Sequence, residues 1–203
     1  MASVYDFKPR FQNRLRPAVD ALVRAGVRPN HLTLAALAGS IAIGALLPLA
    51  RSRPLVLLML PGWLLARMAL NAMDGMAARE HGLHSALGAV LNELGDVLSD
   101  VALYLPLATL EPALLWPAVA FALGAMLTEF AGVLAQALSG RRRYDGPMGK
   151  SDRALLIGVL GLITTFVPRT LRGWPLVLAL AALLTLATAV RRLAPAVAAP
   201  AAR

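Results

Sequence analysis

The chain has 203 residues, of which 58% are hydrophobic, and it contains no cysteine, which excludes disulfides and thiolate metal sites. Soluble domains are roughly 45–50% apolar, so this excess and a mean hydropathy of +0.66 indicate a membrane protein of one compact bundle. The net charge of +9 does not indicate nucleic-acid binding, because the basic residues cluster at the ends of apolar segments.

Residues 1–30 predict an amphipathic helix that lies at the membrane interface and does not cross it. Its apolar stripe consists of Phe7, Phe11, Leu15, Val19 and Leu22, at steps of three and four residues. Most basic residues of this stretch lie off the stripe. The alternative is a disordered basic tail.

Residues 31–192 predict a membrane domain of six transmembrane helices. The apolar stretches run roughly over 32–50, 54–78, 85–109, 112–138, 154–168 and 174–190. Most of them reach the ~20 residues that span a bilayer, and the fifth is short. Because backbone polar groups in lipid must be satisfied within each segment, the fold class is all-α. The Ala- and Pro-rich residues 193–203 predict a disordered tail.

The placement of lysine and arginine predicts the orientation of the bundle. With the N-terminus inside, fifteen of the 20 Lys and Arg residues lie on the inner side and four on the outer side. The positive-inside rule then places both termini, and the turn near Gly82, on the cytoplasmic side of an inner membrane.

Two polar stripes flank this turn. The second apolar stretch carries Asn71, Asp74, Gly75 and Ala78 on one helical face, and the third carries Ser85, Gly88, Asn92, Gly95, Asp96, Ser99 and Asp100. The two helices run antiparallel, so we expect the stripes to face each other. Small-residue packing would explain the glycines but not the carboxylates. Facing carboxylates at this depth need a hard divalent cation with oxygen ligands, Mg²⁺ or Mn²⁺.

The same residues form a spaced motif, D-G-x2-A-R from Asp74 to Arg79 and, eight residues later, G-x3-N-x3-D from Gly88 to Asp96. It resembles the signature of the CDP-alcohol phosphatidyltransferase family, D-x2-D-G-x2-A-R-x8-9-G-x3-D-x3-D. Asparagine replaces the first and third aspartates, at Asn71 and Asn92.

The resemblance implies roles for the motif residues. It implies metal ligation at Asn71, Asp74, Asn92 and Asp96, nucleotide or diphosphate contacts at Gly75, Ala78, Arg79 and Gly88, and Asp96 as the general base. It also implies a homodimer and CDP-diacylglycerol as the commonest donor. The two asparagines each remove one negative charge, which leaves three alternatives. The site holds one ion, or it holds two with help from Glu93 or Asp100, or it is inactive.

Two further groups of charges lie outside the motif. The loop after the fourth stretch carries Arg141, Arg142, Arg143, Lys150 and Arg153, which we interpret as contacts to an anionic acceptor or to lipid headgroups, or alternatively as topology signals alone. Arg67 lies within an apolar stretch. We expect Asp100, Glu129 or both to neutralise it, unless each lines a wet cavity separately.

The sequence therefore predicts a membrane enzyme of phospholipid biosynthesis. It would move a substituted phosphate from a CDP-alcohol lipid to a small alcohol or phosphorylated alcohol, with release of CMP. The alternatives are a small membrane transporter and a non-catalytic relative that binds lipid or nucleotide.

Overall fold

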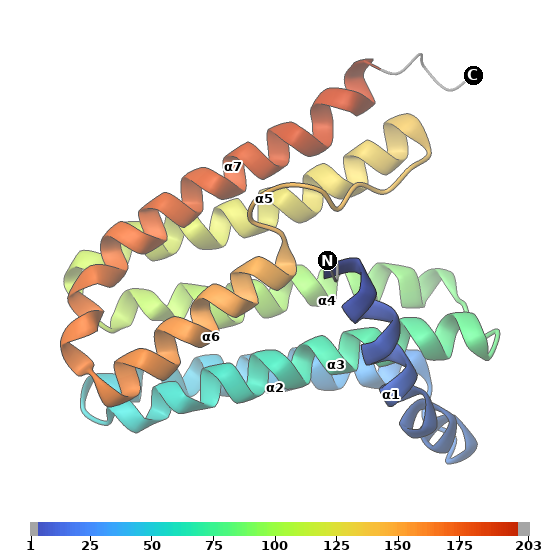
Figure 1. The fold of residues 1–203 in the computed structure, drawn as a ribbon, viewed down its shortest axis with the longest axis horizontal. Coiled ribbons are helices and arrows are strands. Elements are labelled where there is room, and N and C mark those ends of the chain that lie inside the picture. Colours follow the sequence, from blue (N-terminus) through green and yellow to red (C-terminus); the bar gives the residue numbers. More distant parts are fainter. Residues whose placement is uncertain (1–3, 199–203) are drawn as a thin grey trace.

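A computed structural model describes residues 4–198, with side chains from residue 11 onward, and this part of the chain is helical without any strand. The helices are α1 (Val4–Arg24), α2 (Pro29–Leu46), α3 (Met59–Glu80), α4 (Ala86–Tyr104), α5 (Leu115–Ser139), α6 (Lys150–Phe166) and α7 (Trp174–Ala198). Helices α2 to α7 form one bundle, and α1 crosses its end near the turn between α3 and α4 (Figure 1). The predicted all-α class is confirmed.

Short 3₁₀ turns cap the opposite end of the bundle. They are η1 (Leu47–Arg51), η2 (Pro54–Leu58), η3 (Leu105–Thr109), η4 (Pro112–Leu114) and η5 (Pro168–Gly173). Each has a proline at its first or second position. Proline lacks the N–H that an α-helix interior needs, so the chain tightens and turns back there.

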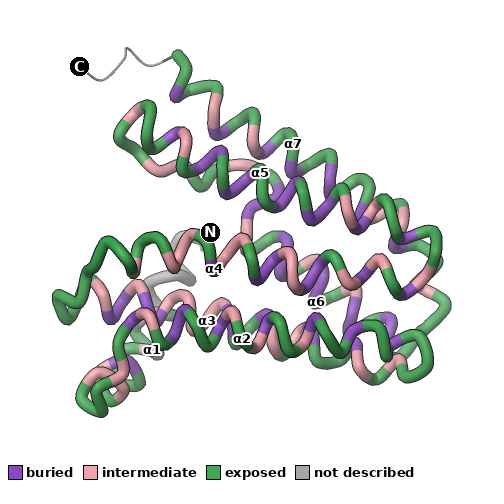
Figure 2. Tube along the Cα trace, turned by 180° about the vertical axis from the view of Figure 1, so that it is seen from behind, coloured by how far each residue is buried: buried purple, intermediate pink, exposed green. Residues whose placement is uncertain are grey.

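The bundle packs in two parts that α4 joins. Helix α2 contacts α3 and α4, and α3 contacts α6, whereas α5 pairs most extensively with α7 and also contacts α4 and η3. Buried positions recur along each helix with exposed positions between them (Figure 2). The main apolar core includes Tyr104, Phe121 and Trp174, which are each fully buried.

In the described part of the chain, four helical segments are long and apolar enough to cross a membrane: Pro29–Arg51, Pro54–Glu80, Pro112–Ser139 and Pro168–Ala198. Helices α4 and α6 do not meet this standard. Helix α4 carries the carboxylates of Glu93, Asp96 and Asp100, and α6 has only 17 residues. The prediction of six membrane crossings therefore stays a prediction for these two helices.

Helix α1 docks on the protein by its apolar stripe. Val19 is fully buried against Met73, Met76 and Ala77 of α3. Leu15 and Leu22 pack on the same cluster, Phe11 is 43% exposed, and the Phe7 side chain lies outside the described residues. Much of the stripe thus faces α3, because the last turn of α3 offers an apolar surface for it.

The C-terminal end corrects one expectation. Helix α7 continues through Pro195 to Ala198, so residues 193–198 are helical and do not form a disordered tail. Alanine is the strongest helix former, and Ala196 is buried, which together carry the helix past the proline. Residues 199–203 lie outside the described residues.

Candidate active site

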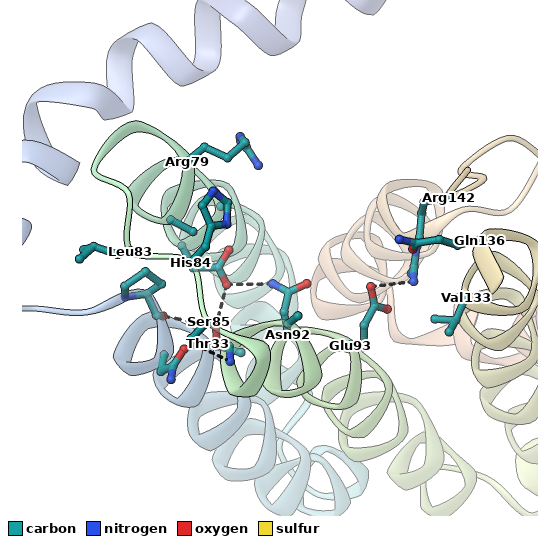
Figure 3. Close-up of a pocket in the computed structure, with 17 residues that line it drawn as sticks. Thr33, Arg79, Leu83, His84, Ser85, Asn92, Glu93, Val133, Gln136 and Arg142 are labelled. Carbon is teal, nitrogen blue, oxygen red and sulfur yellow. Dashed lines mark hydrogen bonds and ion pairs between the residues drawn. The ribbon is translucent and has the colours of Figure 1, made fainter. Parts of the chain in front are cut away.

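A polar cavity of about 370 Å³ opens where the start of α2 meets the turn between α3 and α4. The lining residues that concern the chemistry are Asn30, Thr33, Asp74, Gly75, Arg79 and Asn92. Figure 3 shows Arg79 and His84 at one side of this first cavity and Asn92 at its centre. The motif turn therefore forms a concave site, because the antiparallel helices α3 and α4 present their polar stripes to each other.

Asp74 is the buried carboxylate of the first cavity, with 2% of its surface exposed. Its Oδ2 accepts hydrogen bonds from Thr33 Oγ1 at 2.8 Å and Asn92 Nδ2 at 3.2 Å, while its Oδ1 is buried without a hydrogen-bond partner. Nothing in the sequence marks Thr33 as a site residue beyond a hydroxyl near the start of the first apolar stretch.

Asp96 faces a second cavity, of about 400 Å³, on the other side of Asn92. Its Oδ1 accepts a hydrogen bond from Asn71 Nδ2 at 2.7 Å, and its Oδ2 lies 2.5 Å from Lys150 Nζ. Arg67 Nη2 is 3.4 Å from Oδ1. The structure thus brings Asp74, Asp96 and both asparagines together, but it assigns the two carboxylates to different cavities.

The two asparagines pair with the two carboxylates across the helix interface. Asn71 of α3 donates to Asp96 of α4, and Asn92 of α4 donates to Asp74 of α3. Two facing carboxylates at either place would repel each other, whereas an amide donates a hydrogen bond and carries no charge. The substitutions therefore let α3 and α4 pack closely before any cation is bound.

The donor set suits a hard divalent cation only in part. The buried, unpartnered Oδ1 of Asp74 is a vacant acceptor of the kind such an ion takes, and the amide oxygens of Asn71 and Asn92 are further oxygen donors. Within residues 4–198, however, no cluster of three His, Cys, Asp or Glu side chains is placed to hold a metal. The vacant oxygen of Asp74 thus fits a hard cation, whereas both oxygens of Asp96 already accept hydrogen bonds, from Asn71 and Lys150.

Glycines leave open space beside Asp74. A Cβ added at Gly75 would meet only the guanidinium of Arg79, at 3.0 Å, so the rest of that space belongs to the cavity. Gly88 is more confined, because its Cβ would lie 2.8 Å from Asn30 Oδ1 and 2.9 Å from Ser85 Oγ. Ala78 and Arg79 line the first cavity as well, and Arg79 is exposed at its edge.

A buried ion-pair network lies beneath Asp96. Arg67 Nη1 is 2.5 Å from Asp100 Oδ1, and Arg153 Nη2 is 2.8 Å from Asp100 Oδ2. Arg153 Nη2 also lies 2.9 Å from Glu129 Oε1. The prediction that Asp100 neutralises Arg67 is confirmed, whereas Glu129 pairs with other arginines. Because arginines take both oxygens of Asp100, we assign this residue to the network and not to metal binding.

The five cations predicted in one loop take three different places, and two of them, Lys150 and Arg153, lie in the first turn of α6. Arg142 and Lys150 line the second cavity, and Arg153 is buried in the network below it. Arg143 pairs with Asp145 at 2.9 Å, and Arg141 is exposed. Arg192 of α7 also lines this cavity, but in sequence it is indistinguishable from a basic residue that ends a membrane helix.

A sequence model of the family described as CDP-alcohol phosphatidyltransferase matches residues 27–192. The chain therefore belongs to this family, and the predicted class of phosphotransferase is confirmed. The chain is also similar to the inner membrane protein YnbA of Escherichia coli strain K12. The two are 47% identical over 190 residues, which cover 94% of each chain.

Solved structures share the fold. The phosphatidylinositol phosphate synthase PgsA1 of Mycobacterium tuberculosis with CDP-DAG bound superposes with a TM-score of 0.75 at 22% identity, over 91% of this chain and 94% of that chain. The same synthase in complex with manganese and citrate gives a TM-score of 0.75 at 22% identity, over 91% and 89% of the two chains.

The network predicts unequal and non-additive losses of stability. Arg67→Leu leaves Asp100 paired with Arg153, whereas Asp100→Leu removes a close partner of both arginines. Arg67 then keeps only Asp96, at 3.4 Å, and Arg153 keeps Glu129, so this variant should cost more, about 3–5 kcal/mol. The double variant should lose less than the sum, because fewer charges then lack a partner. Thermal unfolding in detergent measures all three. The exposed pair Arg16 and Glu80 is the control, and the same substitutions there should have small, additive effects. Additivity at Arg67 and Asp100 would contradict the pairing.

Proposed function

We propose that the chain transfers the phosphatidyl group of CDP-diacylglycerol, or a closely similar CDP-alcohol lipid, to the hydroxyl of an acceptor alcohol and releases CMP. The observation that carries the proposal is the pair of adjoining cavities. Both are lined by Asn92, Glu93 and Arg142, yet only the first is lined by Asp74 and only the second by Asp96. Such a division suits two substrates that meet at α4.

The first cavity has the features that a nucleotide diphosphate requires. Gly75 allows close approach to the backbone, and the exposed guanidinium of Arg79 offers a planar fork for phosphate oxygens. Asn30 and His84 supply further polar contacts. We assign Gly75, Ala78, Arg79 and Gly88 to binding of the CDP group.

An apolar groove beside this cavity supports a lipid donor. The groove has a volume of about 680 Å³ and lies between α4 and α5, with Leu94, Met126 and Phe130 among its lining residues. It shares Ala89, Glu93 and Val133 with the first cavity. A CDP-lipid can therefore place its polar head in the cavity and its acyl chains in the groove, which faces the membrane interior. The similar synthase PgsA1 has CDP-DAG bound.

The second cavity places Asp96 beside the acceptor. In the reaction the acceptor oxygen bonds to the phosphorus that carries the lipid alcohol, and the bond from this phosphorus to the CMP oxygen breaks. The hydroxyl proton moves to the carboxylate of Asp96, which acts as general base. Lys150 and Asn71 hold the carboxylate in place by hydrogen bonds.

Asp74 and Asp96 would hold one divalent ion, Mg²⁺ or Mn²⁺, with the amide oxygens of Asn71 and Asn92 as further donors. When bound, this ion would neutralise charge on the diphosphate oxygens and on the leaving CMP. Two carboxylates balance the charge of one such ion, and Lys150 supplies an additional positive charge at Asp96. The similar synthase PgsA1 forms a complex with manganese.

The membrane placement follows from the same features. We propose that α2 to α7 all cross the inner membrane, with the buried network neutralising the carboxylates and arginines of α4 and α6. The name of the Escherichia coli relative, an inner membrane protein, supports this location. The cytoplasmic position of both termini and of the site rests on the distribution of Lys and Arg. The homodimer stays a prediction.

Two other functions are less well supported. A transporter would not need a nucleotide-binding motif in one cavity and a candidate base in an adjoining one. A non-catalytic binding protein would not need the carboxylate of Asp96 to face a second cavity. Metal-dependent release of CMP from CDP-diacylglycerol by the purified protein separates the proposed enzyme from both.

Loss of the Asp96 carboxylate should affect turnover alone, whereas loss of the Asp74 carboxylate should also affect donor binding. Asp96→Asn should lower the turnover number by about 10²–10⁴ while binding of CDP-diacylglycerol survives, because the base is lost from the acceptor side. Asp74→Asn, the matched change in the first cavity, should weaken donor binding as well. CMP release and equilibrium binding of the donor measure the two effects. Normal turnover by Asp96→Asn would contradict its role as base.

Gly75→Ala should weaken binding of CDP-diacylglycerol by about tenfold or more, because a methyl group in a substrate pocket costs about 1–3 kcal/mol. The thermal midpoint should hardly change, since the added Cβ meets only the mobile Arg79 side chain. Gly62→Ala is the control in the same helix, where a Cβ would meet nothing within 4 Å. Equal donor affinity in the two variants would show that Gly75 does not contact the nucleotide.

Restoring the family's aspartates should change metal binding. We expect one tight Mn²⁺ per wild-type chain and two in the Asn71→Asp, Asn92→Asp double variant. We also expect about tenfold tighter binding, or ~1.4 kcal/mol, from the added charge. Electron paramagnetic resonance of free Mn²⁺ counts the bound ions without reference to turnover. An unchanged stoichiometry and affinity would mean that neither asparagine is a ligand.

A further inference from the structure

The second cavity is rich in both kinds of charge. Its charged lining consists of the carboxylates of Glu93, Asp96, Glu129 and Asp152 and the cations of Arg142, Lys150 and Arg192. Carboxylates therefore outnumber cations. A net positive cavity would be expected if its ligand carried a phosphate group.

Each cation of this cavity already has partners within the protein, and among their nitrogens only Arg142 Nε is buried without one. Lys150 Nζ lies 2.5 Å from Asp96 Oδ2. Arg142 bridges two carboxylates, with Nη1 2.6 Å from Glu93 Oε1 and Nη2 3.3 Å from Glu129 Oε2. Figure 3 shows the Glu93 side chain of α4 turned toward the Arg142 guanidinium. An incoming anion would compete with both glutamates for the same guanidinium.

Arg192 is occupied by the backbone of the neighbouring segments. Only 2% of its surface is exposed. Its Nη1 donates to the carbonyl of Thr128 and lies 3.9 Å from a Glu129 oxygen, Nε donates to Asp145 O at 3.2 Å, and Nη2 donates to Tyr144 O at 3.4 Å. Two of its nitrogens thus hold the loop between α5 and α6 against α7, and the third holds α5.

A phosphate in this cavity would break existing pairs. To bind Arg142 it would displace Glu93 or Glu129 and break an ion pair of 2.6 or 3.3 Å, and Glu129 would then rely on Arg153 and Arg192 alone. Hydroxyl groups face no such obstacle, because they donate to carboxylates and accept from Lys150 without changing the charge. The cavity discriminates by an unfavourable contact with anions as well as by favourable contacts with alcohols.

We propose that the acceptor is an alcohol without a phosphate or other anionic group, a neutral polyol bound through its hydroxyls in the second cavity. This inference rests on the proposed function, and it narrows the predicted acceptor, which included phosphorylated alcohols. Glu93 is the residue that decides the choice, because it neutralises Arg142 where the two cavities meet.

Matched pairs of acceptors test the substrate class. CMP release from CDP-diacylglycerol is measured with glycerol against glycerol 3-phosphate and with inositol against inositol 3-phosphate. The neutral member of at least one pair should give a kcat/KM at least about tenfold above its phosphorylated partner. Preference for the phosphorylated member would overturn the inference but leave the proposed function intact. Absence of CMP release with any acceptor would instead overturn the proposed function.

Phosphate binding tests the inference without turnover. With the first cavity occupied by saturating CMP, millimolar inorganic phosphate, compared with potassium chloride of equal ionic strength, should leave the thermal midpoint of the wild-type protein unchanged and should raise that of Glu93→Gln. Asp145→Asn is the control. It releases Arg143, which lies in the same loop as Arg142 but outside the second cavity. The hydrogen bond from Arg143 holds the pKa of Asp145 below its ordinary value, so this control also removes a real charge.

The results have definite meanings. Stabilisation of Glu93→Gln alone would support the exclusion of anions by the Glu93–Arg142 pair. Stabilisation of the wild-type protein to the same extent would overturn it. If phosphate changed the thermal midpoint of Glu93→Gln no more than that of Asp145→Asn, this ion pair would not decide which acceptor enters.

Discussion

The carboxylate of Asp100 lies between two arginines, and the placement of the whole site depends on this contact. Arg67 of α3 and Arg153 of α6 approach its two oxygens at 2.5 and 2.8 Å, and all three side chains are nearly or fully buried. A lone charge at this depth would be strongly unfavourable, so the three helices must meet where these groups can neutralise one another. Glu129 extends the network to α5 and, through Arg192, to α7. The bundle is thus tied together directly under Asp96.

Helix α4 divides the space above this network. Asn92, Glu93 and Arg142 line both cavities, while Asp74 and Asp96 each line one. Consecutive turns of one helix carry Asn92 and Asp96, so the rigidity of α4 sets the separation between the two cavities. Precise positioning of two reactants is a large part of what an enzyme supplies, and side chains on helices hold their geometry better than side chains on loops.

The asparagines change the electrostatics of the motif without changing its shape. Their amides donate to Asp96 and Asp74, and Lys150 adds an ammonium at Asp96. The site therefore balances most of its negative charge with its own residues and relies less on bound cations. The same principle governs the second cavity, where Arg142 is neutralised by Glu93 and Glu129. A balanced polar site of this kind favours ligands that bring hydroxyls rather than charge.

The sequence by itself determined the helical class, the facing polar stripes of α3 and α4, and Asp100 as one of two candidate partners of Arg67. These features follow from helical periodicity and from counting residues away from a short turn. It did not determine that Glu129 pairs with Arg153, that Thr33 bonds Asp74, or that α1 docks on α3. Such contacts join segments that are distant in the chain, and no local spacing encodes them. The same limit applies to the loop cations, which look alike in sequence. Only tertiary packing decided which guanidinium is buried, which is neutralised in the cavity and which remains at the surface.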